Sequence, residues 1–499
     1  MLRVLGVKNQ KNIVVIGSGF ASLSAACFLA KEGYDVTMLE KNDQTGGRAR
    51  IWEHEGFKFD MGPSWYWMPD VFENFFKQFG KKPSYYYQLK RLDPAYRIYF
   101  GKDDHLDVPA GRAQLYALFE SIEPGSSKAL DEFLRQAEYK YEVGMGEYVF
   151  KPSNSMTEYL SVDLLKSSRG LQLLTGMDKH VRKYFSNPKL VQLLEFPVLF
   201  LGAAPKNIPA MYSLMNYADL VLGTWYPMGG MNEIVKAMTS LAEELGVKII
   251  KNAEVTKIDV KDGKARAVCT QSAVYDADMV VSGADYAHTD QHLLDKPFHN
   301  YSEKYWDSRT MSPSSLLFYI GLNKKVDGIR HHNLFFDEDF KQHSDEIYTH
   351  PQWPQKPLFY VCCPSKTDNT VAPERCENLF FLIPVAPDLE DTEAIRRQYF
   401  NLLMDRFENI TGQSIRDNIV VNRSYAIDDF KADYHAFKGN AYGLANTLMQ
   451  TAFLKPAMRN KKVKNMFYTG QLTVPGPGVP PAIISGEVVA REVVKYFGN

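Results

Sequence analysis

A glycine-rich turn near the start of the chain has the residue types and spacing that bind a pyrophosphate. Gly17-Ser18-Gly19-Phe20-Ala21-Ser22 follows the apolar run Asn12–Ile16 and opens a segment whose apolar residues recur at helical spacing. Gly17 permits a tight turn, and Gly19 lacks a Cβ, so the backbone can approach phosphate oxygens closely. The N–H groups at the helix start supply donors and the positive end of a dipole. The pattern predicts a dinucleotide-binding strand–turn–helix unit.

An acidic residue stands where such a unit contacts the ribose. Glu40 closes the second apolar run, Asp35–Glu40, about 20 residues beyond the turn. Its carboxylate can accept hydrogen bonds from ribose hydroxyls and disfavours a 2′-phosphate, so we do not expect NADP. The sequence has no second strand–Gly-x-Gly-x-x-Gly–helix pattern, so we expect no separate nicotinamide domain.

A second glycine-rich segment, Gly46-Gly47-Arg48-Ala49, follows Glu40 closely. Two adjacent glycines permit close backbone approach, and a guanidinium can grip phosphate with two parallel hydrogen bonds. This position, directly after the ribose-binding acid, favours a cofactor contact over a solvated surface turn.

Four further motifs indicate which family of dinucleotide-binding proteins the chain resembles. They are Asp60-Met61-Gly62-Pro63-Ser64, Gly202-Ala203-Ala204-Pro205, Tyr226-Pro227-Met228-Gly229-Gly230-Met231 and the segment from Tyr468 to Pro480. With the first three segments they resemble the flavoprotein superfamily that includes amine oxidases and, within it, the bacterial-type phytoene (carotenoid) desaturases. The match is weakest from about Tyr301 to Tyr425. The resemblance implies FAD contacts from Gly17, Ser18, Gly19, Phe20, Ala21, Glu40, Lys41, Gly46, Gly47, Arg48, Ala49, Met61, Gly62, Pro63, Ser64, Val255, Gly470, Gln471, Val479 and Pro480.

The resemblance also implies an activity. A phytoene-type desaturase transfers a hydride from an allylic carbon of a C40 carotenoid to flavin N5, and a neighbouring proton is then lost. Flavin reoxidation would use oxygen or a quinone, and the FAD would be noncovalent because no cysteine follows Cys376. A hydrophobic polyene needs an apolar tunnel, for which Trp65, Tyr66, Trp67 and Met68 are our candidate lining residues.

Several alternatives remain open at the level of sequence. One is a later carotenoid desaturase, such as a 3,4-desaturase of a hydroxylated carotenoid. Another is a non-redox isomerase or carrier that binds both flavin and carotenoid. A flavin amine oxidase is disfavoured by the ending Pro475-Gly476-Pro477-Gly478. The sequence nominates no catalytic acid or base; for His180 and Arg182 we expect surface roles.

The elements that position these motifs indicate an α/β fold. We predict a Rossmann-like FAD-binding domain, a substrate domain of mixed sheet and helix, and a helical region that is a candidate for membrane contact. Apolar strands are expected at Met279–Val281, Leu316–Ile320 and Leu379–Ile383, with a hairpin turning at Asp262-Gly263. The FAD-binding domain is assigned to residues 1–110, 225–300 and 460–499, the helical region to 111–224 and the substrate domain to 301–459.

Composition excludes other classes of function. The 58 basic and 59 acidic residues give a formal net charge of -1, so we expect no nucleic-acid binding. The five cysteines have neither metal-ligand nor disulfide spacing, so we predict no metal site and a reducing, cytoplasmic setting. No apolar run reaches the length of a spanning helix. We expect peripheral contact with a membrane surface, with Leu199 and Phe200 as the candidate patch.

Overall fold

Five short apolar strands form the parallel sheet that carries the first glycine-rich turn. The computed structural model describes residues 11–155, 158, 172, 175–199, 202 and 204–498. The sheet has the order β19-β13-β1-β2-β9, and every neighbouring pair is parallel. Apolar runs of this kind suit strands that are covered on both faces. The strands are β1 (Asn12–Ile16), β2 (Asp35–Leu39), β9 (Lys248–Ile250), β13 (Met279–Ser282) and β19 (Met466–Tyr468).

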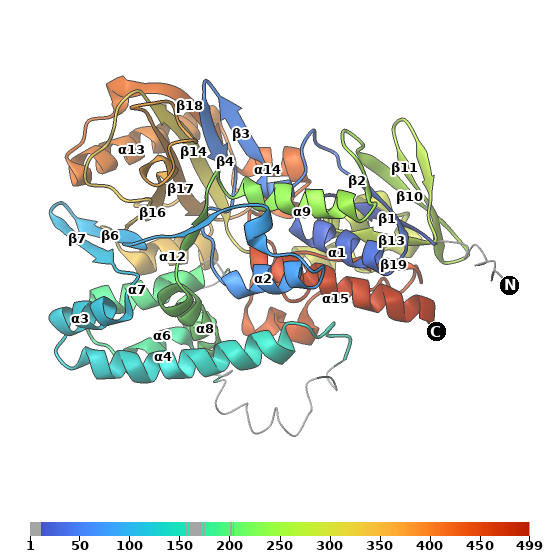
Figure 1. The fold of residues 1–499 in the computed structure, drawn as a ribbon, viewed down its shortest axis with the longest axis horizontal. Coiled ribbons are helices and arrows are strands. Elements are labelled where there is room, and N and C mark those ends of the chain that lie inside the picture. Colours follow the sequence, from blue (N-terminus) through green and yellow to red (C-terminus); the bar gives the residue numbers. More distant parts are fainter. Residues whose placement is uncertain are drawn as a thin grey trace.

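Helices α1 (Phe20–Lys31), α9 (Asn232–Glu244) and α15 (Val479–Gly498) pack beside this sheet (Figure 1). The sheet therefore unites three segments far apart in sequence, as the motifs predicted. The predicted hairpin is also present: β10 (Val255–Lys261) and β11 (Lys264–Thr270) turn at Asp262 and Gly263, both with positive φ. With β12 (Val274–Asp276) they form a three-stranded antiparallel sheet.

A second, seven-stranded sheet forms the upper left lobe of Figure 1. Its order is β18-β14-β17-β16-β15-β6-β7, and only β15 and β6 run parallel. The predicted strands at 316–320 and 379–383 lie inside β14 and β17. The strands are β6 (Tyr96–Gly101), β7 (Asp104–Val108), β14 (Ser314–Leu322), β15 (His332–Phe335), β16 (Phe359–Cys362), β17 (Glu377–Val385) and β18 (Ile419–Tyr425).

The β6–β7 hairpin lies within residues 1–110, which the sequence analysis assigned to the FAD-binding domain. It pairs instead with β15 of the substrate-domain sheet, in the register Asn333 to Arg97. The alternation of apolar residues shows that a strand has a buried face, but it does not identify the strand's partner. Two small sheets join β3 (Ile51–His54) with β4 (Phe57–Asp60) and β5 (Leu89–Arg91) with β8 (Trp225–Pro227).

Helices form the lower left of the molecule (Figure 1). They belong to residues 111–224, for which the sequence predicted a helical region. They are α3 (Arg112–Ile122), α4 (Ser126–Val143), α6 (Met177–Arg182), α7 (Pro188–Leu199) and α8 (Leu214–Tyr217). The remaining α-helices of the described chain are α2 (Pro69–Lys77), α10 (Tyr286–His288), α11 (Glu303–Asp307), α12 (Phe340–Tyr348), α13 (Glu393–Thr411) and α14 (Ile427–Tyr434).

Within the described residues, no helix combines the length and apolar character needed to cross a bilayer. The membrane patch proposed from sequence cannot be placed on this fold: Phe200 and the side chain of Leu199 lie outside the described residues, as does Ala203 of the motif at 202–205.

Candidate functional site

The first glycine-rich turn lies at the carboxyl end of β1, where open α/β sheets bind their ligands. Gly17 has φ +83°, and a Cβ there would lie 3.3 Å from the backbone nitrogen of Ala284. Gly19 is the N-cap of α1, so the helix directs its first N–H groups toward this turn. The sequence therefore builds a cradle of backbone donors with no side chain filling it.

Glu40 lies beside this cradle, directly after β2, and is 4% exposed. Its carboxylate accepts hydrogen bonds from the backbone N–H of Ser18 and of Asn42, both at 2.8 Å, and from the Ser18 hydroxyl. These bonds fix an acceptor group at the carboxyl ends of β1 and β2.

The Gly46-Gly47-Arg48 segment packs against the same turn. Gly46 and Gly47 both have positive φ, and a Cβ on Gly47 would lie 3.3 Å from Gly19 Cα. Arg48 extends from this segment across the Tyr434 ring and donates to the Asn440 carbonyl at 3.1 Å.

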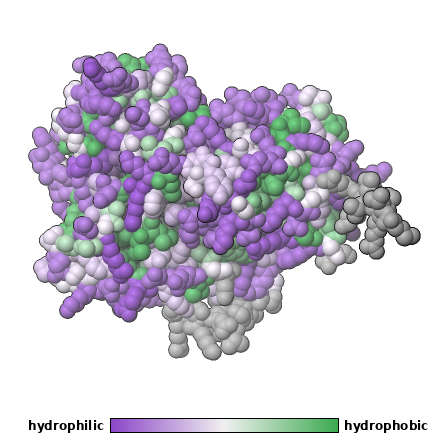
Figure 2. Space-filling view, viewed as in Figure 1, coloured by the Kyte–Doolittle hydropathy of each residue, from purple (hydrophilic) through white to green (hydrophobic). Residues whose placement is uncertain are grey.

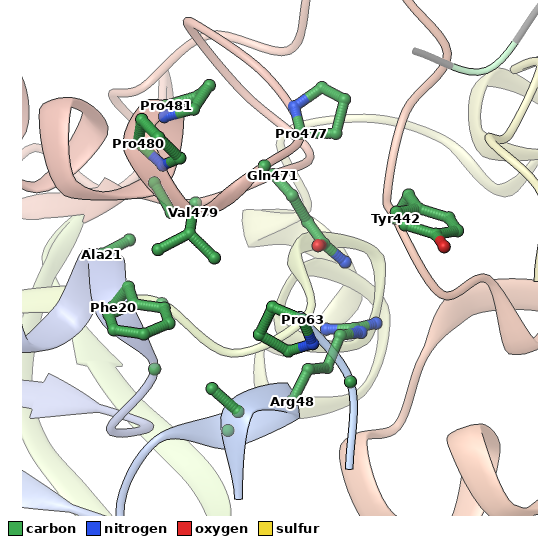
Figure 3. Close-up of a pocket in the computed structure, with 18 of the residues that line it drawn as sticks. Phe20, Ala21, Arg48, Pro63, Tyr442, Gln471, Pro477, Val479, Pro480 and Pro481 are labelled. Carbon is green, nitrogen blue, oxygen red and sulfur yellow. The ribbon is translucent and has the colours of Figure 1, made fainter. Parts of the chain in front are cut away.

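The Gln471 amide lies opposite Arg48, and Figure 3 shows the two side chains directed toward each other. With its oxygen facing Arg48, this amide accepts from both terminal guanidinium nitrogens at 3.0 Å. Arg48 Nε is buried and has no hydrogen-bond partner in the described part of the chain. The Arg48 guanidinium is therefore held in place with one N–H group still available for a hydrogen bond.

One cavity of about 850 Å³ joins these groups. Of the residues expected from sequence to contact the cofactor, all but Met61 line it. Met61 instead lies in the core, where its carbonyl accepts the Tyr319 hydroxyl at 2.8 Å. The lining residues are Gly17, Ser18, Gly19, Phe20, Ala21, Glu40, Lys41, Gly46, Gly47, Arg48, Ala49, Gly62, Pro63, Ser64, Val255, Gly470, Gln471, Val479 and Pro480.

The cavity continues into an apolar end. Trp65, Trp67 and Met68 line it, whereas Tyr66 does not. Tyr66 points to the other side of this extended segment, stacks on Phe72 with ring centroids 4.3 Å apart, and bonds to the Tyr87 hydroxyl. The rest of the apolar end includes Pro197, Pro209, Met211, Leu214, Met215, Leu317, Phe380 and Leu382.

Several lining residues had not been singled out from sequence. Gly283, Ala284 and Asp285 follow β13, so the rule that ligands bind at the carboxyl ends of parallel strands could have found them. His288 and His435 stack at 4.0 Å near Lys41. Burial is the main cause that lowers the pKa of His288 to about 3, and the neighbouring His435, His292 and Lys41 act in the same direction, so this ring is neutral. No local sequence signal brings these two histidines together.

The structure corrects the surface role expected for His180. The residue is 2% exposed, and its Nε2 lies 3.3 Å from Nζ of the buried Lys140. Helix α6 is too short for its periodicity to reveal which face is buried. Arg182 remains half exposed and pairs with Glu195. Neither residue lines the cavity.

Comparison with known proteins decides which family this site belongs to. Residues 20–494 match the family described as flavin containing amine oxidoreductase. The carotenoid 3,4-desaturase of Haloarcula japonica is 42% identical over 486 residues, covering 97% of this chain and 98% of that protein. A 4,4′-diapophytoene desaturase (4,4′-diaponeurosporene-forming) of Staphylococcus aureus is 32% identical over 496 residues, with the same coverage.

The chain belongs to the carotenoid desaturase family of flavin-dependent amine oxidoreductases.

Solved structures agree on the fold of this carotenoid desaturase family member. An oxidoreductase from Methanosarcina mazei matches with a TM-score of 0.62 at 17% identity, covering 96% of this chain and 100% of that one. Putrescine oxidase bound to putrescine also reaches 0.62, at 14% identity, covering 97% and 99%. At these identities the likeness concerns the fold alone.

The cofactor of the family is FAD, and the residues present fit it. The donor cradle at Gly17 and Gly19 suits a pyrophosphate, and Glu40 suits a ribose. Arg48 Nε is buried and has no hydrogen-bond partner among the described residues, so it is available to donate a hydrogen bond to a polar atom of the cofactor. The N-terminal end of α15, at Val479 and Pro480, completes the wall of the cavity.

Proposed function

We propose that this protein is an FAD-dependent desaturase that removes two hydrogens from a carotenoid to introduce a conjugated double bond. The observation that carries the proposal is the continuity of the cavity, which runs from the dinucleotide cradle into the apolar end beyond Trp65. A polyene without polar groups binds by apolar burial, at about 0.8 kcal/mol per CH₂. An apolar chamber that opens directly onto the cofactor cradle suits such a substrate.

The finer assignment that we propose is 3,4-desaturation of a hydroxylated carotenoid. It is supported by the 42% identity with the Haloarcula japonica enzyme, against 32% with the diapophytoene desaturase. A phytoene-type C40 desaturase, the first expectation from sequence, is the second candidate. It is supported by the motifs at Tyr226–Met231 and Tyr468–Pro480.

Bound FAD supplies the acceptor for the hydride that leaves the allylic carbon. The backbone cradle and Glu40 would hold the pyrophosphate and a ribose of FAD, and Arg48 and Gln471 line the same cavity. Trp65, Met211 and Leu214 would hold the polyene and keep bulk water away, so that the allylic cation formed on the substrate loses a proton to a weak base or a single water molecule rather than adding water. The polyene stabilises its own charge, so positioning and dryness are the main tasks of the protein.

Pigment analysis tests the proposal. The chain is expressed in one bacterium that accumulates phytoene and in another that accumulates a hydroxylated carotenoid with a saturated 3,4 bond. We expect a product two hydrogens lighter in the second strain. A coloured product in the phytoene strain alone would select the second candidate, and unchanged pigments in both strains, with FAD bound, would reject desaturation.

A cavity-filling variant is the matched control for that experiment. Met211→Trp puts a larger side chain in the apolar lining and should lower product at least tenfold; flavin absorbance of the purified variant shows that FAD is retained. Met228→Trp, which alters a methionine that does not line the cavity, serves as the comparison.

We further propose that the enzyme works at the cytoplasmic surface of a membrane and passes its electrons to oxygen or a quinone. The support is chemical: substrate and product partition into lipid, and quinones share that phase. Anaerobic reoxidation of the reduced protein by an added quinone, compared with reoxidation by oxygen, distinguishes the two acceptors.

A further inference from the structure

Two histidines and a cysteine meet in the substrate-domain sheet, outside the cavity lining. His332 begins β15 and pairs in register with Cys362 at the end of β16, and His331 directly precedes β15. All three are buried, with exposures of 4% for His331, 0% for His332 and 2% for Cys362. One ligand atom of each lies within 4.8 Å of the other two.

Hydrogen bonds to Nδ1 of each ring orient both imidazoles. His331 Nδ1 lies 2.8 Å from the Thr367 hydroxyl, and His332 Nδ1 lies 2.6 Å from the Tyr360 hydroxyl. The Tyr360 hydroxyl is also a donor to the Ser64 hydroxyl at 3.0 Å and interacts with Cys362; in the tautomer in which His332 Nδ1–H donates to Tyr360, His332 Nε2 carries a free lone pair. This is the arrangement by which proteins fix metal-binding histidines.

The other nitrogen of each ring, Nε2, has no such partner among the described residues. Nε2 of His331 and Nε2 of His332 are both buried and lack a hydrogen bond to any described residue. Buried polar atoms are almost always satisfied, so two unpaired ring nitrogens on adjacent residues indicate a missing ligand. The third atom of the group is a thiol sulfur, which water would pair with poorly and a soft or borderline metal would pair with well.

Nearby charges favour a cation. Asp60 acts electrostatically on Cys362, and Asp368 on His331, where Lys90 acts in the opposite direction. Both carboxylates are held by backbone N–H groups, Asp60 by Met231 and Asn232 and Asp368 by Gly229 and Thr370. They would offset the charge that remains when a divalent ion binds one thiolate and two neutral rings.

We propose that His331 Nε2, His332 Nε2 and Cys362 Sγ bind one zinc ion. Zinc lies roughly 2.0–2.1 Å from nitrogen and 2.3 Å from sulfur, which places tetrahedral ligand atoms roughly 3.3–3.6 Å apart. The ligand atoms of the three residues lie within 4.8 Å of one another, so binding would draw them together by up to about 1.5 Å. Binding forms one S–Zn bond and releases the thiol proton to solvent. Nitrogen and sulfur donors exclude the hard ions magnesium and calcium.

The ion would stiffen the wall of the cavity. The His332 ring stacks on Trp65 with centroids 4.0 Å apart and planes 11° apart, and Trp65 lines the apolar end. A metal that fixes the His332 ring therefore also fixes Trp65. None of the three ligands lines the cavity, so zinc binding can be measured separately from carotenoid turnover.

Metal analysis of the purified flavoprotein tests the site. We expect one zinc ion per chain after zinc-supplemented expression, and an X-ray absorption spectrum at the zinc edge with one sulfur and two imidazole nitrogens in the first shell. A chromophoric chelator in competition gives the dissociation constant. Protein that contains no zinc and binds none on titration, or a spectrum without sulfur, would overturn the proposal.

Variants separate this site from adventitious binding. Cys362→Ser should weaken zinc at least 100-fold, and Thr367→Val, which removes only the bond that orients His331, should weaken it about 10- to 100-fold. Cys363→Ser is the matched control, since this neighbouring buried thiol contacts Ser365 and Glu377 instead. Flavin absorbance reports folding. If Cys362→Ser does not fold, Thr367→Val decides; equal zinc affinity in Thr367→Val and the native chain would contradict the proposed ligands.

Discussion

Glu40 holds its carboxylate ready at the strand ends through bonds from Ser18 and Asn42. Glu40→Gln keeps the size of the side chain and removes its charge. Hydrogen bonds to charged groups exceed neutral ones by about 1 kcal/mol or more, so the dissociation constant for FAD should rise about 10-fold. Titration of the apoprotein with FAD, followed by flavin fluorescence, measures it. Glu32→Gln at the exposed end of α1 is the control, and equal affinities of the two variants would contradict the ribose role.

Lys140 is a residue whose charge should depend on pH within the physiological range. Its side chain is fully buried, bonds to Ser213, Ala210 and His180, and has a pKa lowered by burial to about 7. Because the unfolded lysine titrates near 10.4, between these values the unfolded chain binds one more proton than the folded chain. Stability contributed at this site therefore rises with pH above 7, by about 1.4 kcal/mol per unit.

Lys140→Met should remove that slope. The difference in free energy of unfolding between the native chain and the variant, measured by urea denaturation from pH 7 to 8.5, is expected to change by about 2 kcal/mol in favour of the native chain. Buried thiols such as Cys27 begin to contribute with the opposite sign above this window. A difference that stays constant with pH would show that Lys140 keeps its proton when folded.

At the scale of elements, α1 and α15 pack closely together at Gly486. A Cβ at this position would lie 2.3 Å from the Ala21 carbonyl oxygen and 2.6 Å from Ser24 Cβ. Gly486→Ala must therefore push α15 away from the first turns of α1. We expect a loss of about 1–3 kcal/mol in stability and weaker FAD binding, since Ala21 belongs to the cradle. Thermal unfolding and FAD titration measure both. Gly498→Ala, in open space at the end of the same helix, should change neither.

The same elements show what the sequence could predict. The strands and helices around Gly17, Glu40 and Gly263 are set by short-range features, namely apolar runs, positive-φ turns and helix starts, and the structure confirms them. Tyr66 shows a limit of motif reading: it faces away from the cavity that Trp65, Trp67 and Met68 line, and the motif itself does not show which side of the segment a side chain faces.

Contacts between distant strands could not be predicted. The β6–β7 hairpin joins the second sheet through a parallel pairing with β15, and His332 meets Cys362 only because β15 and β16 are neighbours there. Both depend on strand order, which local periodicity does not encode.

For the molecule as a whole, the cavity must open where a lipid-borne substrate can enter. Hydrophilic residues dominate the face shown in Figure 2. By contrast, the segment from Thr451 to Leu454 lines the cavity, and nearby apolar side chains reach solvent: Met449 is 74% exposed and Leu454 37%. Exposed apolar groups beside an apolar chamber are typical of an interaction site, and here we infer contact with a bilayer.

Charging this segment should detach the protein from membranes. Met449→Glu with Leu454→Glu places two carboxylates where apolar groups would enter the headgroup region, so binding to vesicles of anionic lipid should fall at least tenfold in a flotation assay. Val420→Glu, at a side chain 47% exposed on the edge strand β18, provides a control for an added negative charge on an apolar surface residue. Turnover of detergent-solubilised carotenoid should persist in Val420→Glu and in Met449→Glu alone, because neither side chain lines the cavity, whereas Leu454 does. Equal flotation of the charged variant and the control would place the membrane contact on another surface.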